Sequence, residues 1–99
     1  MAILIYRQMS MDTVFKALAD PSRRKILDLL KQKDMSVTDL QEHFGFTQAS
    51  LSHHLDILKR ADLVVTERRG QFIFYSLNAS VFEEMANSIL NYFNYDKRK

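Results

Sequence analysis

The sequence contains no cysteine, one proline and two glycines. Without cysteine the fold can hold neither a disulfide nor a thiolate metal site. Such low proline and glycine content, with no low-complexity tract, also excludes a disordered body. A chain of 99 residues is too short for two separately cored units. We therefore expect one domain that depends on its apolar core.

Long hydrophobic runs are also missing. The apolar stretch Ile3–Tyr6 ends at Arg7, far short of a signal-peptide core or of the roughly 20 residues that span a membrane. We therefore expect a cytoplasmic protein. Residues 1–10 are interpreted as a leader, an upstream start or a dimer-contacting arm, and residues 11–99 as the folded domain.

The charge balance is only weakly basic. A net charge of +2 and a pI near 9.0 permit nucleic-acid binding but do not demonstrate it. The cations are unevenly placed, because five of them face the single carboxylate Asp28 between Pro21 and Lys33, whereas Glu83 and Glu84 lie near the C-terminus. This distribution predicts a basic side and a neutral side.

Polar residues mark the beginnings of two early helices. Apolar residues at helical spacing follow Asp12, and Asp20 before Pro21 is a strong helix start. The helix that begins there has the apolar stripe of a half-buried helix and is expected to stop near Gln32.

Two further helices are predicted close together. Ser36 with Asp39 resembles a capping box, and Gly45 is expected to end this third helix in a left-handed conformation. Thr47 then caps a fourth helix whose apolar stripe includes His54. Two helices therefore meet across a very tight turn.

The C-terminal half predicts strands and then a long helix. Apolar runs at 63–66 and 72–75 flank a charged segment with Gly70, which indicates a two-stranded β-hairpin. Asn78 caps a last helix with a wide apolar face that needs a partner. The predicted fold class is mainly α, a winged helix-turn-helix with five helices and a two-stranded β-hairpin wing.

A short helix, a tight turn, a second helix and a hairpin form the arrangement that places one helix in the DNA major groove. The outer N-terminal half of the fourth predicted helix carries small or neutral hydrogen-bonding groups. Gln48 can bond to adenine, serine can bond at base edges or phosphates, and Ala49 allows close approach to the backbone. This combination favours double-stranded DNA as the partner.

Three separated stretches resemble the signature sequences of ArsR-type bacterial repressors. They are ALADPSRRKIL at 17–27, TQASLSHHL at 47–55 and LKRADLV at 58–64. Within that family the likeness is closest to SdpR-type autorepressors, through VFKA at 14–17, KILDLLK at 25–31 and GQFIFYSLN at 70–78. The resemblance covers roughly residues 11–77, and it implies a homodimeric repressor on a palindromic operator that overlaps a promoter.

The resemblance also assigns roles to individual residues. The implied base-reading residues are Gln48, Ser50, Ser52 and His53. The implied phosphate or minor-groove contacts are Thr47, Lys59, Arg68, Arg69 and Gln71. The implied dimer interface, from the first and last helices, is Val14, Phe15, Leu18, Phe82, Met85, Ile89 and Phe93. A membrane protein that sequesters the repressor is a further partner that the resemblance suggests.

Several of these basic or aromatic residues also have ordinary structural readings. Arg68 and Arg69 can form a solvated hairpin turn, although paired cations at such a tip suit a phosphate backbone. His54 is interpreted as a core histidine, and His43 as a helix-surface residue. Arg23 and Arg24 are left open between partners of nearby aspartates and DNA ligands.

Metal sensing and catalysis are not expected. The three histidines are His43, His53 and His54, and the adjacent pair points about 100° apart on a helix, so it cannot readily share an ion. Ser52 and His53 are neighbours rather than a nucleophile and a base on one face. We predict no metal, no cofactor and no enzyme, and keep as alternatives a ligand- or metal-responsive sensor and a protein-interaction module of the same fold.

Overall fold

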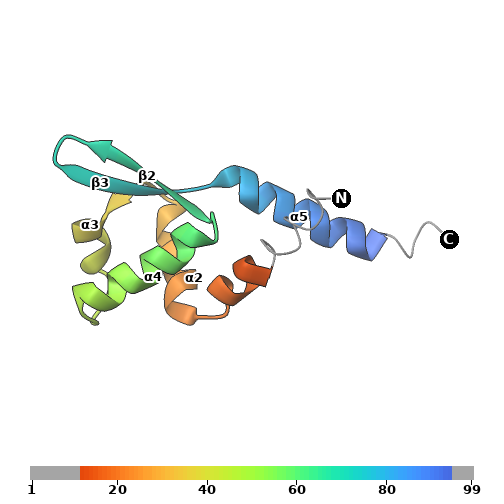
Figure 1. Ribbon diagram of the computed structural model, residues 1–99, viewed down its shortest axis with the longest axis horizontal. Helices are drawn as coiled ribbons and strands as arrows, with labels where there is room; N and C mark the ends of the chain where they lie inside the picture. The colour runs from red at the N-terminus through yellow and green to blue at the C-terminus, as the bar shows by residue number, and fades with distance from the viewer. Residues whose placement is uncertain (1–11, 95–99) are drawn as a thin grey trace.

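A computed structural model describes residues 12–94 (Figure 1). Residues 12–18 are helical, as expected after Asp12. The elements that follow are α2 (Pro21–Leu30), β1 (Met35–Ser36), α3 (Val37–Gln41), α4 (Gln48–Arg60), β2 (Val64–Arg69), β3 (Phe72–Leu77) and α5 (Ala79–Asn94). Five helical segments and the wing hairpin lie in the predicted order within this described range. The interpretation of residues 1–10 falls outside it.

Three of the predicted helix caps are present, at Asp20, Ser36 and Thr47. The Asp20 carboxylate accepts hydrogen bonds from the backbone N–H groups of Ser22 and Arg23. Ser36 and Asp39 form a reciprocal capping box, with both bonds at 3.2 Å. These side chains satisfy N–H groups that a helix start leaves without an intrahelical partner.

The predicted two-stranded wing, β2 and β3, is present and is joined by a third strand in an antiparallel sheet of order β1-β3-β2. The added strand β1 is only two residues long, and Met35 pairs with Tyr75. Such a short strand has no alternation that a sequence could reveal. The hairpin itself turns at Gly70, whose φ of 64° favours glycine.

The turn between α3 and α4 differs from the prediction. The helix α3 ends at Gln41, and within the described residues Gly70 is the only glycine with positive φ, so Gly45 is not a left-handed cap. Side chains hold the turn instead. Gln41 donates to the Phe46 carbonyl at 2.7 Å, and the Phe44 and Phe46 rings stack with centroids 4.8 Å apart.

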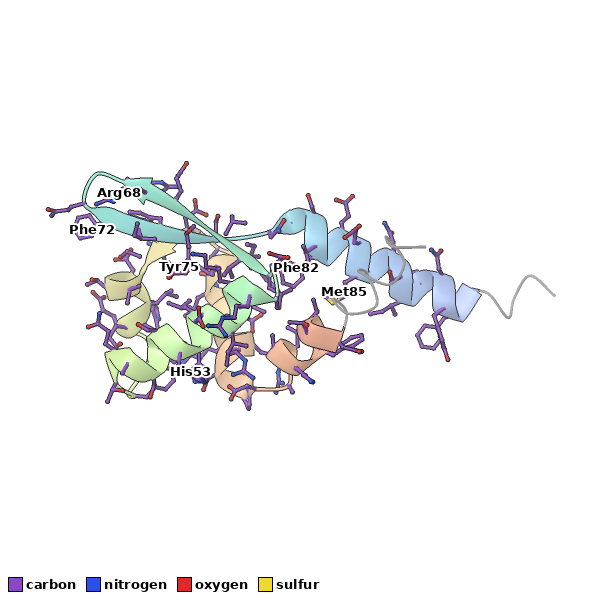
Figure 2. The ribbon with its side chains drawn as sticks, viewed as in Figure 1. His53, Arg68, Phe72, Tyr75, Phe82 and Met85 are labelled. Atoms are coloured by element: carbon purple, nitrogen blue, oxygen red, sulfur yellow. The ribbon has the colours of Figure 1, made fainter. Side chains whose placement is uncertain are left out.

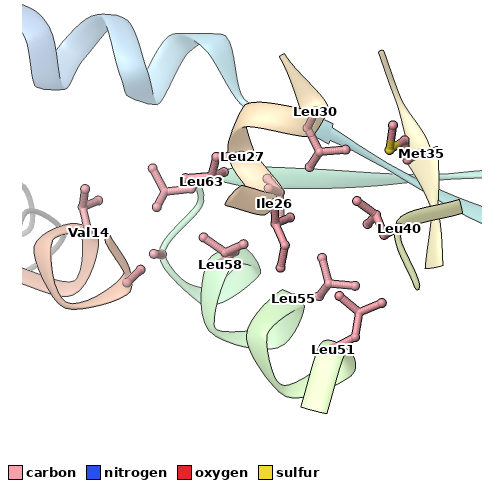
Figure 3. Packing of buried hydrophobic residues seen from close by; sticks show 13 residues of the cluster. Val14, Ile26, Leu27, Leu30, Met35, Leu40, Leu51, Leu55, Leu58 and Leu63 are labelled. Carbon is pink, nitrogen blue, oxygen red and sulfur yellow. The ribbon is translucent and has the colours of Figure 1, made fainter. Parts of the chain in front are cut away.

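The core lies where α2, α4 and the base of the wing meet (Figure 3). Residues 12–18 contribute Val14 and Ala17, and β1 contributes Met35. The helix α5 extends away from this body, and only its first half, through Val81, Phe82 and Met85, packs against the core (Figure 1). The rest of α5 is left with an exposed apolar face.

Candidate nucleic-acid interface

The buried side of α4 determines which residues face outward. Three leucines, Leu51, Leu55 and Leu58, have at most 1% of their surface exposed and point toward α2 (Figure 3). Side chains three or four positions apart share one helix face. Gln48, Ala49, Ser52 and His53 are all exposed and follow one another at spacings of three and four, so they form a continuous exposed surface beside and opposite the leucines, the outward edge of α4.

Thr47 and Ser50, two other residues predicted to contact DNA, form hydrogen bonds with each other at the start of α4. The Thr47 hydroxyl accepts from the Ser50 N–H at 3.1 Å and donates to the Ser50 hydroxyl at 3.2 Å. Ser50 is half-buried and its hydroxyl is bonded to Thr47, unlike the exposed side chains of the outward edge. The structure thus separates Ser50 from the outward edge and gives Thr47 the role of N-cap.

The two adjacent histidines of α4 lie in different environments. His53 is exposed on the outward edge (Figure 2). His54 is half-buried, with its ring near Phe46 and its Nδ1 3.3 Å from Arg23 Nη1. Because a guanidinium only donates, Nδ1 acts as the acceptor in this contact. The prediction that His54 is an internal histidine is confirmed.

The arginines of α2, Arg23 and Arg24, form hydrogen bonds within the subunit. Arg23 Nε donates to the Ala17 carbonyl at 2.7 Å, and Arg24 Nη1 donates to the Leu18 carbonyl at 2.6 Å. Both arginines therefore cap the end of the helical residues 12–18. They thus have structural partners within the subunit, and of the two only Arg23 approaches an aspartate of the described range, Asp20, at 3.9 Å.

Lys25 extends this pattern to the α3 turn. Its Nζ donates to the His43 carbonyl at 3.1 Å and lies 4.9 Å from the Phe44 ring centroid. Lys31 forms an ion pair with Asp28 at 3.2 Å. Four of the five cations between Pro21 and Lys33 thus make contacts within the subunit, but this stretch remains net positive, because the carbonyls they contact are uncharged.

Asp20 is the acidic member of the junction between residues 12–18, α2 and α4. Partial burial raises the pKa of its carboxyl, but the backbone hydrogen bonds from Arg23 and Ser22, with the charge of Arg23, outweigh that effect. The pKa of Asp20 is therefore lowered. The carboxylate remains charged at neutral pH and keeps α2 capped.

The C-terminal half of α4 mixes charges of both signs. Lys59, a predicted backbone contact, is exposed. Asp56 pairs with Arg60 at 3.0 Å and lies near Tyr75 of β3, where burial first and the Asp56 charge second raise the pKa of the phenol. Because the Asp56 carboxylate would repel phosphate, we expect the C-terminal half of α4 to contact DNA only through its exposed cation Lys59. Base contacts are therefore expected from the N-terminal half.

The three residues predicted at the wing tip are exposed but are not equivalent. Arg68 Nε donates to the Gly70 carbonyl at 3.3 Å. Arg69 contacts two carboxylates, Asp34 at 2.7 Å and Glu67 at 2.6 Å. Asp34 was missed at the sequence level, since it lies 35 residues away from Arg69 with no pattern to link them.

The predicted dimer residues divide into buried and exposed members. Val14 is 1% exposed and belongs to the core of its own subunit, so its assignment to an interface is wrong. Leu18, Phe82 and Met85 are partly buried against that core. Much of the apolar surface of these three side chains is therefore buried within the subunit.

An apolar groove of about 270 Å³ lies between Phe15 and the second half of α5. Phe15 and Phe93 are 51% and 67% exposed, and Ile89 also lines the groove. Tyr92 lines it too and was not predicted, although its spacing of three from Ile89 was a usable signal.

The histidine and acidic side chains of residues 12–94 are scattered, and the helices of this range are short or polar. No group of three or more histidine, aspartate or glutamate side chains in this range is arranged to hold a metal ion. None of its helices combines the length and the apolar character needed to cross a membrane.

Comparisons with known proteins agree on one family. Residues 20–66 match the model of the bacterial regulatory protein arsR family. The chain is 54% identical to the transcriptional repressor SdpR of Bacillus subtilis over 84 residues. This alignment covers 85% of this chain and 93% of that protein. It is 42% identical over 73 residues to the arsenical resistance operon repressor of Staphylococcus xylosus, covering 74% and 68% respectively.

Solved structures show the same fold. An ArsR-like transcriptional regulator from Rhodococcus sp. RHA1 superposes with a TM-score of 0.84 at 25% identity, over 93% of this chain and 88% of that one. A homodimeric winged helix-turn-helix DNA-binding domain from Mycobacterium bovis gives 0.72 at 26% identity, over 92% and 88%. With this fold and these relatives, the chain belongs to the arsR family of bacterial regulatory proteins.

Proposed function

We propose that this chain is a DNA-binding transcriptional repressor that acts as a homodimer on a palindromic operator, including one in its own promoter. The observation that carries the proposal is the outward edge of α4. Its four side chains have no role in the core, are small or able to form neutral hydrogen bonds, and follow directly on a capped helix start. Such a surface suits base edges in a major groove.

The wing and the end of α4 supply positive charge beside this edge. Arg68 lies at the hairpin tip (Figure 2), and Lys59 is exposed on α4. Cations at such positions are attracted to phosphates and fix the register of a reading helix without reading sequence. The proposed DNA contacts are therefore the outward edge for bases, with Lys59, Arg68 and Gln71 for the backbone.

The apolar groove at Phe15, Ile89 and Phe93 supports the homodimer. An exposed apolar surface of this kind marks an interaction site, and the Mycobacterium bovis domain with the same fold is described as homodimeric. Two copies joined through α5 would present two α4 helices to one duplex. A dimer on a promoter excludes polymerase, which is how binding becomes repression.

The names of the relatives support repression as the outcome, since SdpR and the arsenical operon proteins are described as repressors. A repressor acts where the chromosome is, which supports a cytoplasmic location. The sequestering membrane partner remains a prediction from the resemblance, because none of the observations on residues 12–94 bears on it.

Fluorescence anisotropy with a duplex from upstream of the protein's own gene tests the proposal. The double variant Ser52→Ala, His53→Ala should lose at least about tenfold in affinity, because each good base contact is worth roughly 1–3 kcal/mol. The control His43→Ala removes an exposed histidine outside α4 and should bind as the wild type does.

Undiminished binding by the double variant would remove the outward edge as the reader. A wild type whose affinity does not fall with salt would instead favour a protein-interaction module, since phosphate contacts make DNA binding salt-dependent. A rise in melting temperature with zinc would favour a metal-responsive sensor.

A further inference from the structure

The sheet register places the two wing arginines on opposite faces. Residues directly paired across strands share a face, and neighbours along a strand alternate. Arg68 pairs with Ile73, on the face that includes the buried Val64 and therefore packs on the helical body. Arg69 pairs with Phe72 and lies on the outer face. Only Arg68 is on the same side of the sheet as α4.

Arg69 crosses the outer face from one edge of the sheet to the other. Its guanidinium lies 4.6 Å from the Phe74 ring centroid on the central strand β3. Its Nη2 donates to Asp34 Oδ2 at 2.7 Å, and Asp34 directly precedes β1 at the far edge. Its Nε donates to Glu67 Oε1 at 2.6 Å. We call these four residues the Arg69 clamp.

The charge balance of the clamp is unfavourable for a phosphate. One guanidinium faces two carboxylates, so the three groups together carry a net charge of −1 at neutral pH. The hydrogen bonds to Glu67 and Asp34 raise the pKa of Arg69. Arg68, by contrast, donates to an uncharged carbonyl at the tip. A phosphate that approaches the wing therefore meets the attractive field on the Arg68 side.

We propose that Arg69 is a positioning residue that ties the wing to the α2–β1 connection through Asp34, and that Arg68 is the wing arginine that contacts DNA phosphate. Asp34 follows α2 in the chain, so the clamp fixes the angle of the hairpin relative to the body that carries α4. This inference rests on the proposed function for its DNA contact, whereas the clamp itself is a property of the free protein.

Asp34→Asn separates the two roles by the sign of its effect on DNA affinity. If Arg69 positions the wing, loss of the carboxylate loosens the hairpin, and affinity should fall about three- to tenfold, which lies at the lower end of the coupling measured between neighbouring residues. If Arg69 is a phosphate ligand, removing a competing negative charge frees it, and affinity should rise. The control Asp28→Asn makes the same charge change at an exposed position on α2. Its DNA affinity should neither fall nor rise.

Arg69→Lys gives a second comparison at constant charge. A lysine can still attract a phosphate, but it lacks the planar fork that serves two carboxylates and stacks on a ring. We expect Arg69→Lys to bind about three- to tenfold more weakly with an unchanged salt slope. Arg68→Gln should reduce the slope of log K against log salt by about 0.9, the value for one lost phosphate contact.

Stronger DNA binding by Asp34→Asn, or wild-type affinity in Arg69→Lys, would overturn the positioning role. A salt slope unchanged in Arg68→Gln would overturn the phosphate contact.

Hydrogen exchange of the β2–β3 amides in the free protein tests the clamp without DNA. Asp34→Asn and Arg69→Lys should both speed exchange, Arg69→Lys more because it also loses the Glu67 and Phe74 contacts, and the double variant should exchange no faster than Arg69→Lys alone. Additive effects would overturn the clamp. A wild type that binds no duplex would overturn the proposed function and the Arg68 contact, and the exchange result would still decide the clamp.

Discussion

Single residues at helix ends determine much of this fold, and they were predictable because their partners are close in sequence. Asp20, Ser36 and Thr47 each bond to N–H groups two or three positions ahead. The contact between Asp34 and Arg69 was not predictable, since it depends on a sheet register that brings together residues far apart in the chain. Local polar chemistry is therefore readable from sequence, and long-range ion pairs are not.

Asp20→Ala should reduce the free energy of unfolding by about 1 kcal/mol at pH 7, the usual value for a lost N-cap. The folded pKa of Asp20 is lowered, so its contribution is complete above the unfolded value of about 3.9 and is lost as pH falls through the folded pKa. Urea unfolding of wild type and variant between pH 3 and 7 should therefore show the difference shrinking toward acid.

The matched control is Asp28→Ala, an exposed aspartate in an ion pair on the surface of α2. It should cost little, because exposed pairs contribute less than about 1 kcal/mol. An Asp20 effect that grew on acidification would contradict the assigned cause of its stabilisation.

At the scale of elements, periodicity predicted all five helices, because each has apolar residues at helical spacing, which the core covers except along the second half of α5. It failed for β1, whose two residues are recruited by the edge of β3. It also misplaced the left-handed helix end. Asp62 rather than Gly45 has positive φ, at 59°, directly after α4. Which residue adopts that conformation depends on where the buried Leu63 must lie.

The end of α4 has the hydrogen bonds of a Schellman motif, Leu63 N–H to the Leu58 carbonyl and Asp62 N–H to the Lys59 carbonyl, each 3.0 Å. Asp62→Gly should raise the free energy of unfolding by about 0.5–1 kcal/mol, since glycine adopts this φ without strain. Thermal unfolding measures the change. Asp62→Ala, which keeps a Cβ, should not stabilise, and equal effects of the two substitutions would exclude strain at this residue.

For the whole molecule, the outward edge of α4 and the apolar groove lie on different parts of one subunit. The outward edge could be predicted, because it consists of side chains that remain exposed on α4 once its leucines are buried. The groove could be predicted only in part. The sequence shows that α5 is apolar, but not that Phe82 and Met85 pack inward while Ile89 and Phe93 remain exposed.

Ile89→Glu should convert a dimer to a monomer and weaken operator binding together, because a charge in the groove between Phe15 and Phe93 opposes burial. Sedimentation at micromolar concentration measures the first effect and anisotropy the second. The control Asn87→Glu adds the same charge at an exposed position on another side of α5. A variant that remains dimeric would show that this groove is not the interface.

Hydroxyl-radical footprinting of the promoter duplex tests most directly whether two copies of α4 read one DNA molecule. We predict two protected half-sites of related sequence on one face of the duplex, with centres roughly 34–36 Å apart or a multiple of that distance. Both should disappear together in the Ser52→Ala, His53→Ala variant. A single protected segment, or a pair that persists in that variant, would contradict the account.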